Sequence, residues 1–287
     1  MSGAGPLAQV IGDPIAQSKS PVIHLFWLEK LGLAGDYTAQ HVTSAQLADY
    51  LADMRTRSDW AGCNVTMPHK QAIIPLLDRL DPVAARLAAV NTVVREDDGS
   101  LTGYNTDVDG FLEPLRTQLA QTHLFRMARI FGTGGAARAI IAALAGHGFT
   151  LVVAGRNPDK ARALLNELAP KGEHHAVHLG HFEQATNFAF DDRVNCLDLV
   201  VNASPLGMSG QPELAVDISH APPGSIIYDI VTSPRDTALL QSARQAGHPT
   251  IEGLAMLVGQ AAIAFEKFYA APPPREYDAQ LFELLSA

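Results

Sequence analysis

A glycine-rich turn between an apolar strand and an apolar helix constrains the fold of this chain most strongly. A short predicted strand, Ala128–Phe131, runs into Gly132-Thr133-Gly134-Gly135-Ala136-Ala137, and a helix of small apolar residues follows. In such a G-x-G-x-x-A turn, the first glycine permits a tight bend, the second admits a pyrophosphate, and the alanine packs against the strand. An ordinary strand–helix turn has similar glycines. The second apolar strand, Leu151–Ala154, favours a dinucleotide site instead.

The residues after this second strand indicate which dinucleotide binds. An acidic side chain at that strand end would accept a hydrogen bond from the ribose 2′-hydroxyl of NAD. The chain instead has Gly155-Arg156-Asn157, followed by Lys160. An arginine forks onto a phosphate, so this end predicts NADP, held by Arg156, Asn157 and Lys160. The alternative is a solvated Arg–Lys pair at a helix start, although cations are mildly unfavourable there.

Strands alternate with helices along the whole chain, which predicts an α/β protein with mostly parallel sheets. The 287 residues suffice for two domains. We expect an N-terminal substrate domain of residues 1–107 plus 248–287, and a Rossmann-like domain of residues 108–247, with a cleft between them. Among the predicted elements are continuous helices over Lys70–Leu80 and Thr106–Leu119 and a helix capped by Ser44. The histidine-bearing stretch Gly172–Asn195 is expected to be polar surface.

Composition restricts the partners. The net charge of −9 argues against nucleic acid, whose phosphates require a basic face. Two cysteines imply no disulfide framework, which suits a reducing compartment. The first residues lack the features of a signal peptide, and the apolar run Leu254–Phe265 is too short to span a bilayer. We therefore expect a cytoplasmic protein that binds a small molecule, with no membrane contact, and a homodimer is left open.

Four polar clusters lie outside the predicted nucleotide unit, each at a strand end or helix start, where α/β proteins place ligands. Each cluster by itself is also explained by helix capping. The clusters are Ser18–Pro21, Asn64–Lys70, Val90–Thr92 and Gly103–Asp107.

Taken together, these clusters resemble the motifs of the shikimate dehydrogenase family. Val10–Pro21 resembles its N-terminal signature, Asn64–Lys70 its N-V-T-x-P-x-K motif, and Asn105-Thr106-Asp107 its N-T-D. Glu252–Ala261 resembles its C-terminal G-L-x-M-L-x-x-Q segment. The motifs occur in the family's order and cover essentially the whole chain.

The resemblance implies an NADP-dependent oxidoreductase that reversibly reduces 3-dehydroshikimate to shikimate, a step of chorismate and aromatic amino acid biosynthesis. It makes Lys70 and Asp107 the catalytic pair. By position, the substrate would be bound by Ser18, Ser20, Asn64, Thr66, Asn91, Thr232 and Gln260. The cofactor would be bound by the glycine turn from Gly132 to Ala136, by the Arg156 cluster, and by Ile230, Gly253 and Met256.

The chemistry of ketone reduction suits this pair. A hydride comes from the nicotinamide, and a protein group must supply the proton or stabilise the alkoxide. The Lys70 ammonium can do both, and Asp107 can direct it. The structural alternatives are a solvent-facing lysine and a first-turn dipole partner. His69 is a rival acid–base group, because histidine titrates near neutral pH.

One departure from the family pattern keeps other functions open. Where the family usually has a second tyrosine in a Y-D-x-x-Y segment, this chain has Thr232 after Tyr228-Asp229-Ile230-Val231. A paralogue acting on quinate or a related hydroxy acid, with NAD or NADP, is one alternative, and a nucleotide-binding regulatory module without turnover is another. The histidines between residues 174 and 181 suggest a metal, but no helical period surrounds them, so no metal site is predicted.

Overall fold

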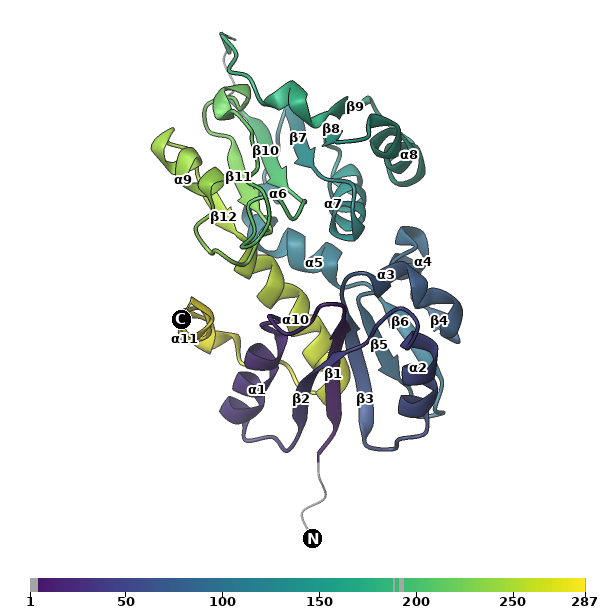
Figure 1. The fold of residues 1–287 in the computed structure, drawn as a ribbon. Coiled ribbons are helices and arrows are strands. Elements are labelled where there is room, and N and C mark those ends of the chain that lie inside the picture. Colours follow the sequence, from purple (N-terminus) through teal and green to yellow (C-terminus); the bar gives the residue numbers. More distant parts are fainter. Residues whose placement is uncertain (1–4, 188, 191–193, 287) are drawn as a thin grey trace. The chain divides into compact units, whose positions relative to one another are not determined.

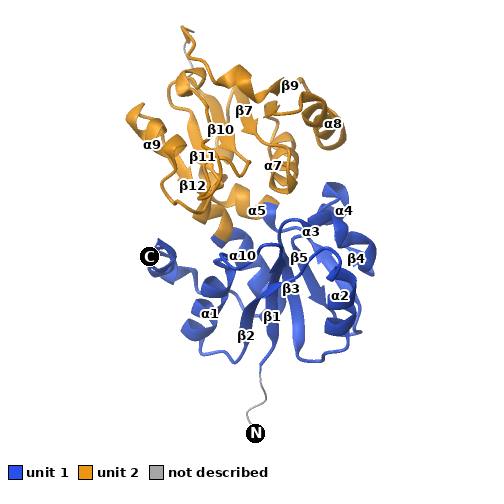
Figure 2. Cartoon of the chain, in the orientation of Figure 1, with its two compact units in different colours: residues 1–107, 258–287 blue, residues 108–257 orange. Residues whose placement is uncertain are grey.

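The computed structural model describes residues 5–187, 189–190 and 194–286. These residues form two compact units, one of residues 1–107 and 258–287 and the other of residues 108–257 (Figure 2). The N-terminal stretch in which no signal peptide is expected lies partly outside the described residues. Among the described helices, none is long and apolar enough to cross a membrane.

The first unit contains a six-stranded mixed sheet in the order β2-β1-β3-β5-β6-β4 (Figure 1). β1 pairs in parallel with β2 and β3, whereas β5 runs antiparallel to both β3 and β6. The strands are β1 (Leu7–Gly12), β2 (Asp36–His41), β3 (Trp60–Val65), β4 (Arg79–Leu80), β5 (Thr92–Arg95) and β6 (Leu101–Tyr104). The helices are α1 (Ser20–Leu31), α2 (Leu47–Arg55), α3 (His69–Ala72), α4 (Pro82–Leu87), most of α10 (Gly253–Tyr269) and α11 (Asp278–Ser286).

The second unit contains a six-stranded, wholly parallel sheet in the order β12-β11-β10-β7-β8-β9. Counted within the unit, this order is 3-2-1-4-5-6 from β9 to β12, the topology of the dinucleotide-binding fold. The predicted α/β class with a Rossmann-like unit is thus confirmed. The strands are β7 (Phe125–Phe131), β8 (Thr150–Gly155), β9 (His174–His178), β10 (Cys196–Asn202), β11 (Ile226–Asp229) and β12 (Thr250–Glu252). The helices are α5 (Asp107–Leu112), α6 (Arg116–Leu119), α7 (Gly135–Gly146), α8 (Pro158–Leu168) and α9 (Ala238–Gln245), with a 3₁₀ turn, η3 (Leu179–Phe182), after β9.

The chain divides between the two units after Asp107 and after Leu257. The boundaries expected from the sequence follow Asp107 and Gly247. β12 accounts for the difference, because it pairs with β11 and completes the second sheet.

Two long helices expected from the sequence are interrupted, in each case at a proline. Residues 70–80 form α3, a 3₁₀ turn at Ile74–Leu76, and β4, because Pro75 cannot donate the backbone hydrogen bond of a continuing helix. Pro114 likewise separates α5 from α6 through a 3₁₀ turn at Glu113–Leu115. The expected cap at Ser44 is also wrong: α2 starts after Gln46, with no side-chain cap.

The stretch expected to be polar surface contains a strand that the sequence did not indicate. β9 (His174–His178) pairs in parallel with β8 over its whole length. It is an edge strand, so its side chains remain partly exposed and polar, and the alternation that identifies a half-buried strand is weak. The side chains of His174 and His178 therefore share one face of the strand.

Aromatic packing covers the first sheet and buries a histidine. His24 on α1 is fully buried, and its ring stacks on Tyr37 at a centroid distance of 4.0 Å. Burial lowers the pKa of His24 to about 3, so the ring is neutral at physiological pH. Phe265 and Phe268 of α10 also pack near this ring. Each such side chain contributes about 1.5–3 kcal/mol through its apolar surface, so α10 is anchored firmly to the sheet.

A glycine in the middle of the first sheet yields a stability prediction. Gly62 in β3 has φ 153°, and a Cβ there would lie 2.1 Å from the carbonyl oxygen of Val93 on β5. Gly62→Ala should therefore lower the free energy of unfolding by more than about 2 kcal/mol, through combined strain and overpacking. Both tryptophans, Trp27 and Trp60, belong to this unit, so tryptophan fluorescence during urea unfolding measures its stability directly.

The matched control is Gly32→Ala at the end of α1. Gly32 also has positive φ, but no atom lies within 4 Å of its Cβ position. Its substitution should cost only the left-handed backbone penalty of about 1–2 kcal/mol. Equal losses in the two variants would show that contact with Val93 is unimportant.

Candidate active site

A buried ion pair lies at the centre of the first unit's polar side chains. Lys70 is in α3, directly after β3, and Asp107 is the first residue of α5. The Lys70 Nζ donates to Asp107 Oδ2 at 2.6 Å, and the two side chains are only 17% and 6% exposed. The Val90 amide donates to the Lys70 carbonyl at 2.7 Å and fixes the start of α3. The structure thus brings together the two residues that the sequence singled out, despite the loops between them.

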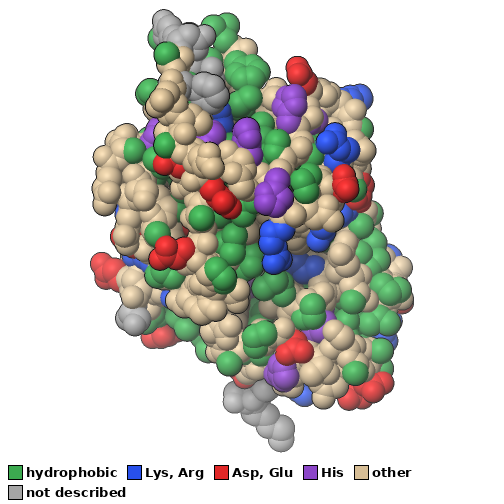
Figure 3. All heavy atoms as spheres, turned by 45° about the horizontal axis from the view of Figure 1, so that its top comes forward, with side chains coloured by type: hydrophobic (Ala, Val, Ile, Leu, Met, Phe, Trp, Pro, Cys, Tyr) green, Lys and Arg blue, Asp and Glu red, His purple; other side chains and the backbone are tan. Residues whose placement is uncertain are grey.

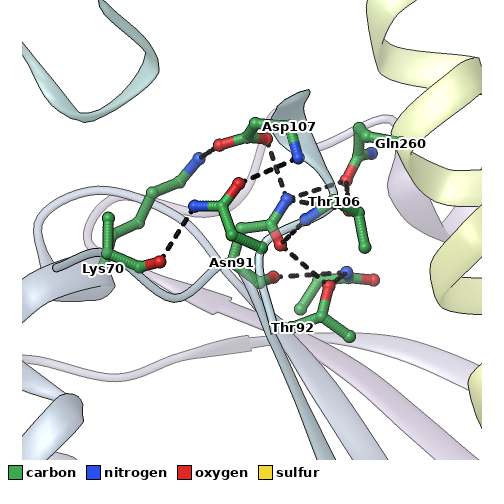
Figure 4. A network of polar contacts seen from close by, with 9 residues as sticks. Lys70, Asn91, Thr92, Thr106, Asp107 and Gln260 are labelled. Atoms are coloured by element: carbon green, nitrogen blue, oxygen red, sulfur yellow. Dashed lines mark hydrogen bonds and ion pairs between the residues drawn. The ribbon is translucent and has the colours of Figure 1, made fainter. Parts of the chain in front are cut away.

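Asn91 links Asp107 of this pair to Thr106 and to Gln260 of α10 (Figure 4). Its Nδ2 donates to Asp107 Oδ1 at 2.8 Å and to Thr106 Oγ1 at 2.9 Å, and it lies 3.5 Å from Gln260 Oε1 on α10. Its Oδ1 accepts a hydrogen bond from the Thr106 amide at 2.8 Å. With one carboxylate oxygen bound by Lys70 and the other by Asn91, Asp107 has a fixed orientation.

A second layer of polar groups supports Asn91 from the sheet. The Thr92 hydroxyl donates to Asn91 Oδ1 at 3.1 Å and accepts from Asn64 Nδ2 at 3.0 Å. The Tyr37 hydroxyl donates to Asn64 Oδ1 at 2.6 Å. Burial raises the pKa of Tyr37 well above its usual value, so the phenol remains a proton donor. Asn64 therefore belongs to the network through Thr92 rather than by contacting Lys70.

Three other predicted substrate residues follow the carboxyl ends of β1 and β3. Ser18 and Ser20 occupy the junction between β1 and α1, where the Ser20 amide donates to Ser18 Oγ at 3.3 Å. The Thr66 amide donates to the Ile11 carbonyl at 3.0 Å, which places Thr66 beside the end of β1. A Cβ on Gly12 would lie 2.5 Å from the Thr66 methyl group, so this glycine lets the two strand ends meet.

His69, the rival acid–base group, lies away from the ion pair. Its ring is fully buried, and Nε2 lies 2.6 Å from the Val42 carbonyl oxygen. A carbonyl only accepts, so Nε2 carries a proton and donates. The residue thus anchors α3 to the chain after β2, and the structure does not support it as the acid–base group.

In the second unit, the glycine turn follows β7. Two of its glycines, Gly132 and Gly134, have different roles. Gly132 has φ 125°, and a Cβ there would lie 2.6 Å from the Ala203 carbonyl oxygen after β10. Gly134 has ordinary backbone angles, φ −89° and ψ −169°, and nothing lies within 4 Å of its Cβ position. Gly132 is therefore required by the fold, whereas the space at Gly134 is open for a ligand.

The start of α7 suits an anion. No side-chain hydrogen bond caps this end among the described residues, so the first amides of the helix, from Gly135 and Ala136 onward, lack a capping side chain. Such amides, together with the helix dipole, bind phosphate groups. Thr133 packs against Gly155, since a Cβ on Gly155 would lie 3.0 Å from the Thr133 methyl group. The turn after β7 and the end of β8 are therefore adjacent.

The end of β8 presents the predicted cations at the surface. Arg156 and Lys160 are both exposed. Asn157 is the N-cap of α8, with Oδ1 accepting from the amides of Asp159 at 2.9 Å and Lys160 at 3.3 Å. Its side chain is thus occupied in capping, while the two cations can reach a phosphate.

A buried carboxylate organises the remaining predicted cofactor residues. Asp229, at the end of β11, accepts from Asn202 Nδ2 at 2.9 Å, from the Val231 amide at 3.0 Å and from the Thr237 hydroxyl at 2.7 Å. Burial raises its pKa, and these three donors oppose the shift. Asp229 thereby fixes the loop that carries Ile230 and Thr232, the latter half-buried.

Gly253 and Met256 both lie at the start of α10, and Gly253 packs closely on this loop. A Cβ on Gly253 would lie 2.3 Å from the Val231 carbonyl oxygen and 2.5 Å from that of Ile230, so only glycine fits. Met256 is buried one turn later. Thr232 was predicted with the substrate residues, but it belongs to the second unit, not to the unit of Lys70 and Asp107.

Sequence reasoning missed several supporting residues. Thr106 bridges Asn91 and Gln260, and Tyr37 supports Asn64, but neither was selected. Ser204, after β10, donates to Asn202 Oδ1 at 2.7 Å beside the glycine turn. The available signal for Ser204 was its place directly after an apolar strand, since ligands gather at the carboxyl ends of parallel strands.

Among the described residues, no group of three or more His, Cys, Asp or Glu side chains could hold a metal ion.

Figure 3 shows acidic side chains scattered around the Lys and Arg side chains on the face that it draws. Such a mixed surface differs from the continuous basic face typical of nucleic-acid binding.

Comparison with known proteins agrees with the geometry. Residues 10–93 match the family model described as the shikimate dehydrogenase substrate binding domain. A protein of Sphingopyxis alaskensis named shikimate dehydrogenase (NADP(+)) is 46% identical over 286 residues, covering 99% of this chain and 98% of its own.

Two solved structures extend this likeness. Shikimate 5-dehydrogenase of Thermus thermophilus, solved with NADP(H) and shikimate, has a TM-score of 0.80 at 33% identity and covers 98% of this chain and 99% of its own. Quinate dehydrogenase of Corynebacterium glutamicum, solved with NAD, has a TM-score of 0.80 at 31% identity with the same coverage, 98% and 99%.

The two glycines of the turn should respond differently to alanine. Gly134→Ala should leave the thermal unfolding temperature unchanged but weaken NADP binding at least about tenfold, because the new methyl group would occupy the phosphate's approach. Gly132→Ala should lower the unfolding temperature instead, since its Cβ would meet the Ala203 carbonyl. Circular dichroism of the ligand-free protein and calorimetric titration with NADP measure the two effects. Unchanged NADP affinity in Gly134→Ala would exclude the turn as the pyrophosphate site.

Proposed function

The chain belongs to the shikimate dehydrogenase family, and from this premise we propose that it reversibly reduces 3-dehydroshikimate to shikimate with NADPH. The observation that carries the assignment of roles is the buried contact between Lys70 and Asp107. A ketone reductase needs a proton donor at the carbonyl oxygen, and the Lys70 ammonium has the required chemistry and a fixed direction.

We assign proton transfer to Lys70. Its ammonium stabilises negative charge on the carbonyl oxygen and donates a proton as the alcohol forms, and in the reverse reaction its amine accepts that proton. Hydride delivery to the carbonyl carbon is the chemistry that bound NADPH supplies. The proton then comes from Lys70, so the hydride and the proton together convert the ketone to the alcohol.

Asp107 directs the lysine. Its Oδ2 accepts from Lys70, while Oδ1 is held by Asn91, so the carboxylate cannot rotate without breaking a second hydrogen bond. Removing one partner of a buried ion pair leaves an uncompensated charge, which costs roughly 3–5 kcal/mol. We therefore expect Asp107 to fix the direction of the ammonium in addition to any contact with the substrate.

The other polar residues of the first unit suit a hydroxylated carboxylic acid. We assign the carboxylate of the substrate to the hydroxyls of Ser18 and Ser20, and its hydroxyl groups to Thr66, Asn91 and Gln260. Asn64 is assigned a supporting role, because its amide is hydrogen-bonded to Thr92. The expected role of Thr232 in substrate binding stays a prediction.

The second unit fits the cofactor. Open space at Gly134, the uncapped start of α7 and the exposed cation of Arg156 are what a pyrophosphate and a 2′-phosphate require. Ile230, Gly253 and Met256 are proposed to lie on the nicotinamide side. Asn157 is assigned to capping α8, and Lys160 supplies a second charge.

A quinate-type activity is the second candidate. The quinate dehydrogenase of Corynebacterium glutamicum is similar over almost the whole chain, and Thr232 departs from the family's usual tyrosine. The end of β8 argues against NAD, because it carries Arg156 and no acid. Comparing kcat/KM for shikimate and quinate, each with NADP and NAD, separates the two candidates.

We also propose that the protein works in the cytoplasm. Cys63 and Cys196 are both free thiols, as is usual in a reducing compartment. A homodimer stays a prediction, and sedimentation of the purified protein measures it.

Replacing the lysine tests the mechanism. Lys70→Ala should lower kcat for shikimate oxidation by about 10²–10⁴-fold, the usual contribution of a general acid–base group. KM should change little, since a group needed mainly in the transition state contributes little to ground-state binding. Steady-state absorbance at the NADPH band measures both constants. Lys30→Ala, an exposed lysine on α1, is the control; near-normal turnover in Lys70→Ala would refute the role.

Replacing the arginine tests the cofactor. Arg156→Ala should reduce kcat/KM for NADP by roughly tenfold or more, because hydrogen bonds to charged groups contribute about 1.5–3 kcal/mol each. The value for NAD should remain within about twofold, since NAD lacks the 2′-phosphate. The control is Arg162→Ala, an exposed arginine on α8, the helix that follows Arg156. A parallel loss with both dinucleotides would contradict the 2′-phosphate assignment.

A further inference from the structure

The edge strand β9 ends beside the proposed 2′-phosphate site. In the parallel register of β8 and β9, Gly155 is paired with His178. Neighbouring strands lie about 4.8 Å apart, so His178 is next to the residue that precedes Arg156. The carboxyl ends of parallel strands are where such sheets bind ligands. The register therefore puts His178 at the same edge as Arg156.

The ring of His178 is held in a defined orientation. Its Nδ1 accepts a hydrogen bond from the Gly180 amide at 3.1 Å, which caps the 3₁₀ turn η3. A Cβ on Gly180 would lie 3.1 Å from this nitrogen, so the glycine keeps the close approach free of strain. Because Nδ1 is the acceptor, the ring proton is on Nε2. An N–H donor is thus fixed at the surface.

The Nε2–H of His178 has no acceptor among the residues that the structure describes. His178 is exposed, and within the described part of the chain no hydrogen bond or ion pair engages its Nε2. Figure 3 shows histidine side chains exposed near Lys and Arg side chains on the face that it draws. A surface N–H at the same strand-end edge as Arg156 is suited to an anionic oxygen.

The charges around the site are mixed. Arg156 and Lys160 are positive, whereas Asp159 lies in the first turn of α8 and the Glu183 carboxyl carbon lies 3.7 Å from the Cβ position of Gly180. Because acidic side chains share these segments with the cations, a directed N–H donor adds discrimination that net charge does not supply.

From these observations we propose that His178 is a specificity-determining residue, which donates its Nε2–H to the 2′-phosphate of NADP alongside Arg156. The inference rests on the proposed NADP-dependent function and adds a residue from a second strand end to that site. It distinguishes His178 from the other histidines of this segment. His174, for example, accepts from the Leu151 amide through Nδ1 and lies at the opposite end of β9.

The test measures binding of a matched pair of ligands by calorimetry, without turnover. Adenosine 2′,5′-bisphosphate carries the 2′-phosphate, and adenosine 5′-monophosphate lacks it. His178→Asn keeps an acceptor for the Gly180 amide, because asparagine is a good cap, but its amide is too short to replace Nε2. We expect affinity for the bisphosphate to fall about tenfold, with affinity for the monophosphate unchanged.

His178→Asp tests how a negative charge at this position changes the affinity for the bisphosphate. Aspartate also caps, but it places a negative charge beside the phosphate, so the bisphosphate should bind more weakly than to His178→Asn. The ratio of kcat/KM for NADP over NAD should fall in the same order. His175→Asn, in the same strand and exposed, is the control and should match the wild type.

The outcomes separate this proposal from the function on which it rests. If both His178 variants keep the wild-type preference for the bisphosphate while Arg156→Ala loses it, His178 only caps η3 and the proposal is overturned. If the wild type shows no preference for the bisphosphate, the NADP assignment itself fails. Unfolding temperatures of the variants close to that of the wild type exclude loss of folding as the cause.

Discussion

The amide of Asn91 is the constraint on which the proposed catalytic geometry depends. An amide offers both donors and an acceptor, so one side chain binds the Asp107 carboxylate, the Thr106 hydroxyl and the Thr106 backbone at once. A carboxylate would repel Asp107, and an aliphatic residue would leave buried polar groups unpaired. The orientation of Lys70 therefore follows from a residue that does not touch it.

The two units solve different physical problems. The first unit must keep a charged pair largely away from water, and it does so by giving each polar atom of Asp107 and Asn91 a partner. The second unit must bind a large anion. Neighbouring backbone occupies the Cβ position of Gly132, whereas the Cβ position of Gly134 is left open. Hydrogen bonds between side chains determine the geometry of the first site. Open space and free backbone amides determine what the second site can bind.

Much of this arrangement could be predicted from the sequence, because the signals were local. The glycine turn and the polar strand ends act within a few residues, and the parallel sheet of the second unit followed from the alternation of strands and helices. Elements decided by distant contacts were less predictable. β9, for example, is recognisable only once β8 is beside it. The helix breaks have a local cause, Pro75 and Pro114, but the predicted helices followed the apolar periodicity across both prolines.

The helix α10 carries a consequence for how substrate preference can evolve. It presents Gln260 to the Asn91 network and, one to two turns later, buries Phe265 and Phe268 in the aromatic core. Moving Gln260 to suit a differently shaped acid would shift those rings and disturb a close-packed interior. The junction at Ser18, half-exposed between β1 and α1, lacks that constraint. New substrate ranges should therefore arise first through the β1–α1 junction, with the helix conserved as a rigid reference.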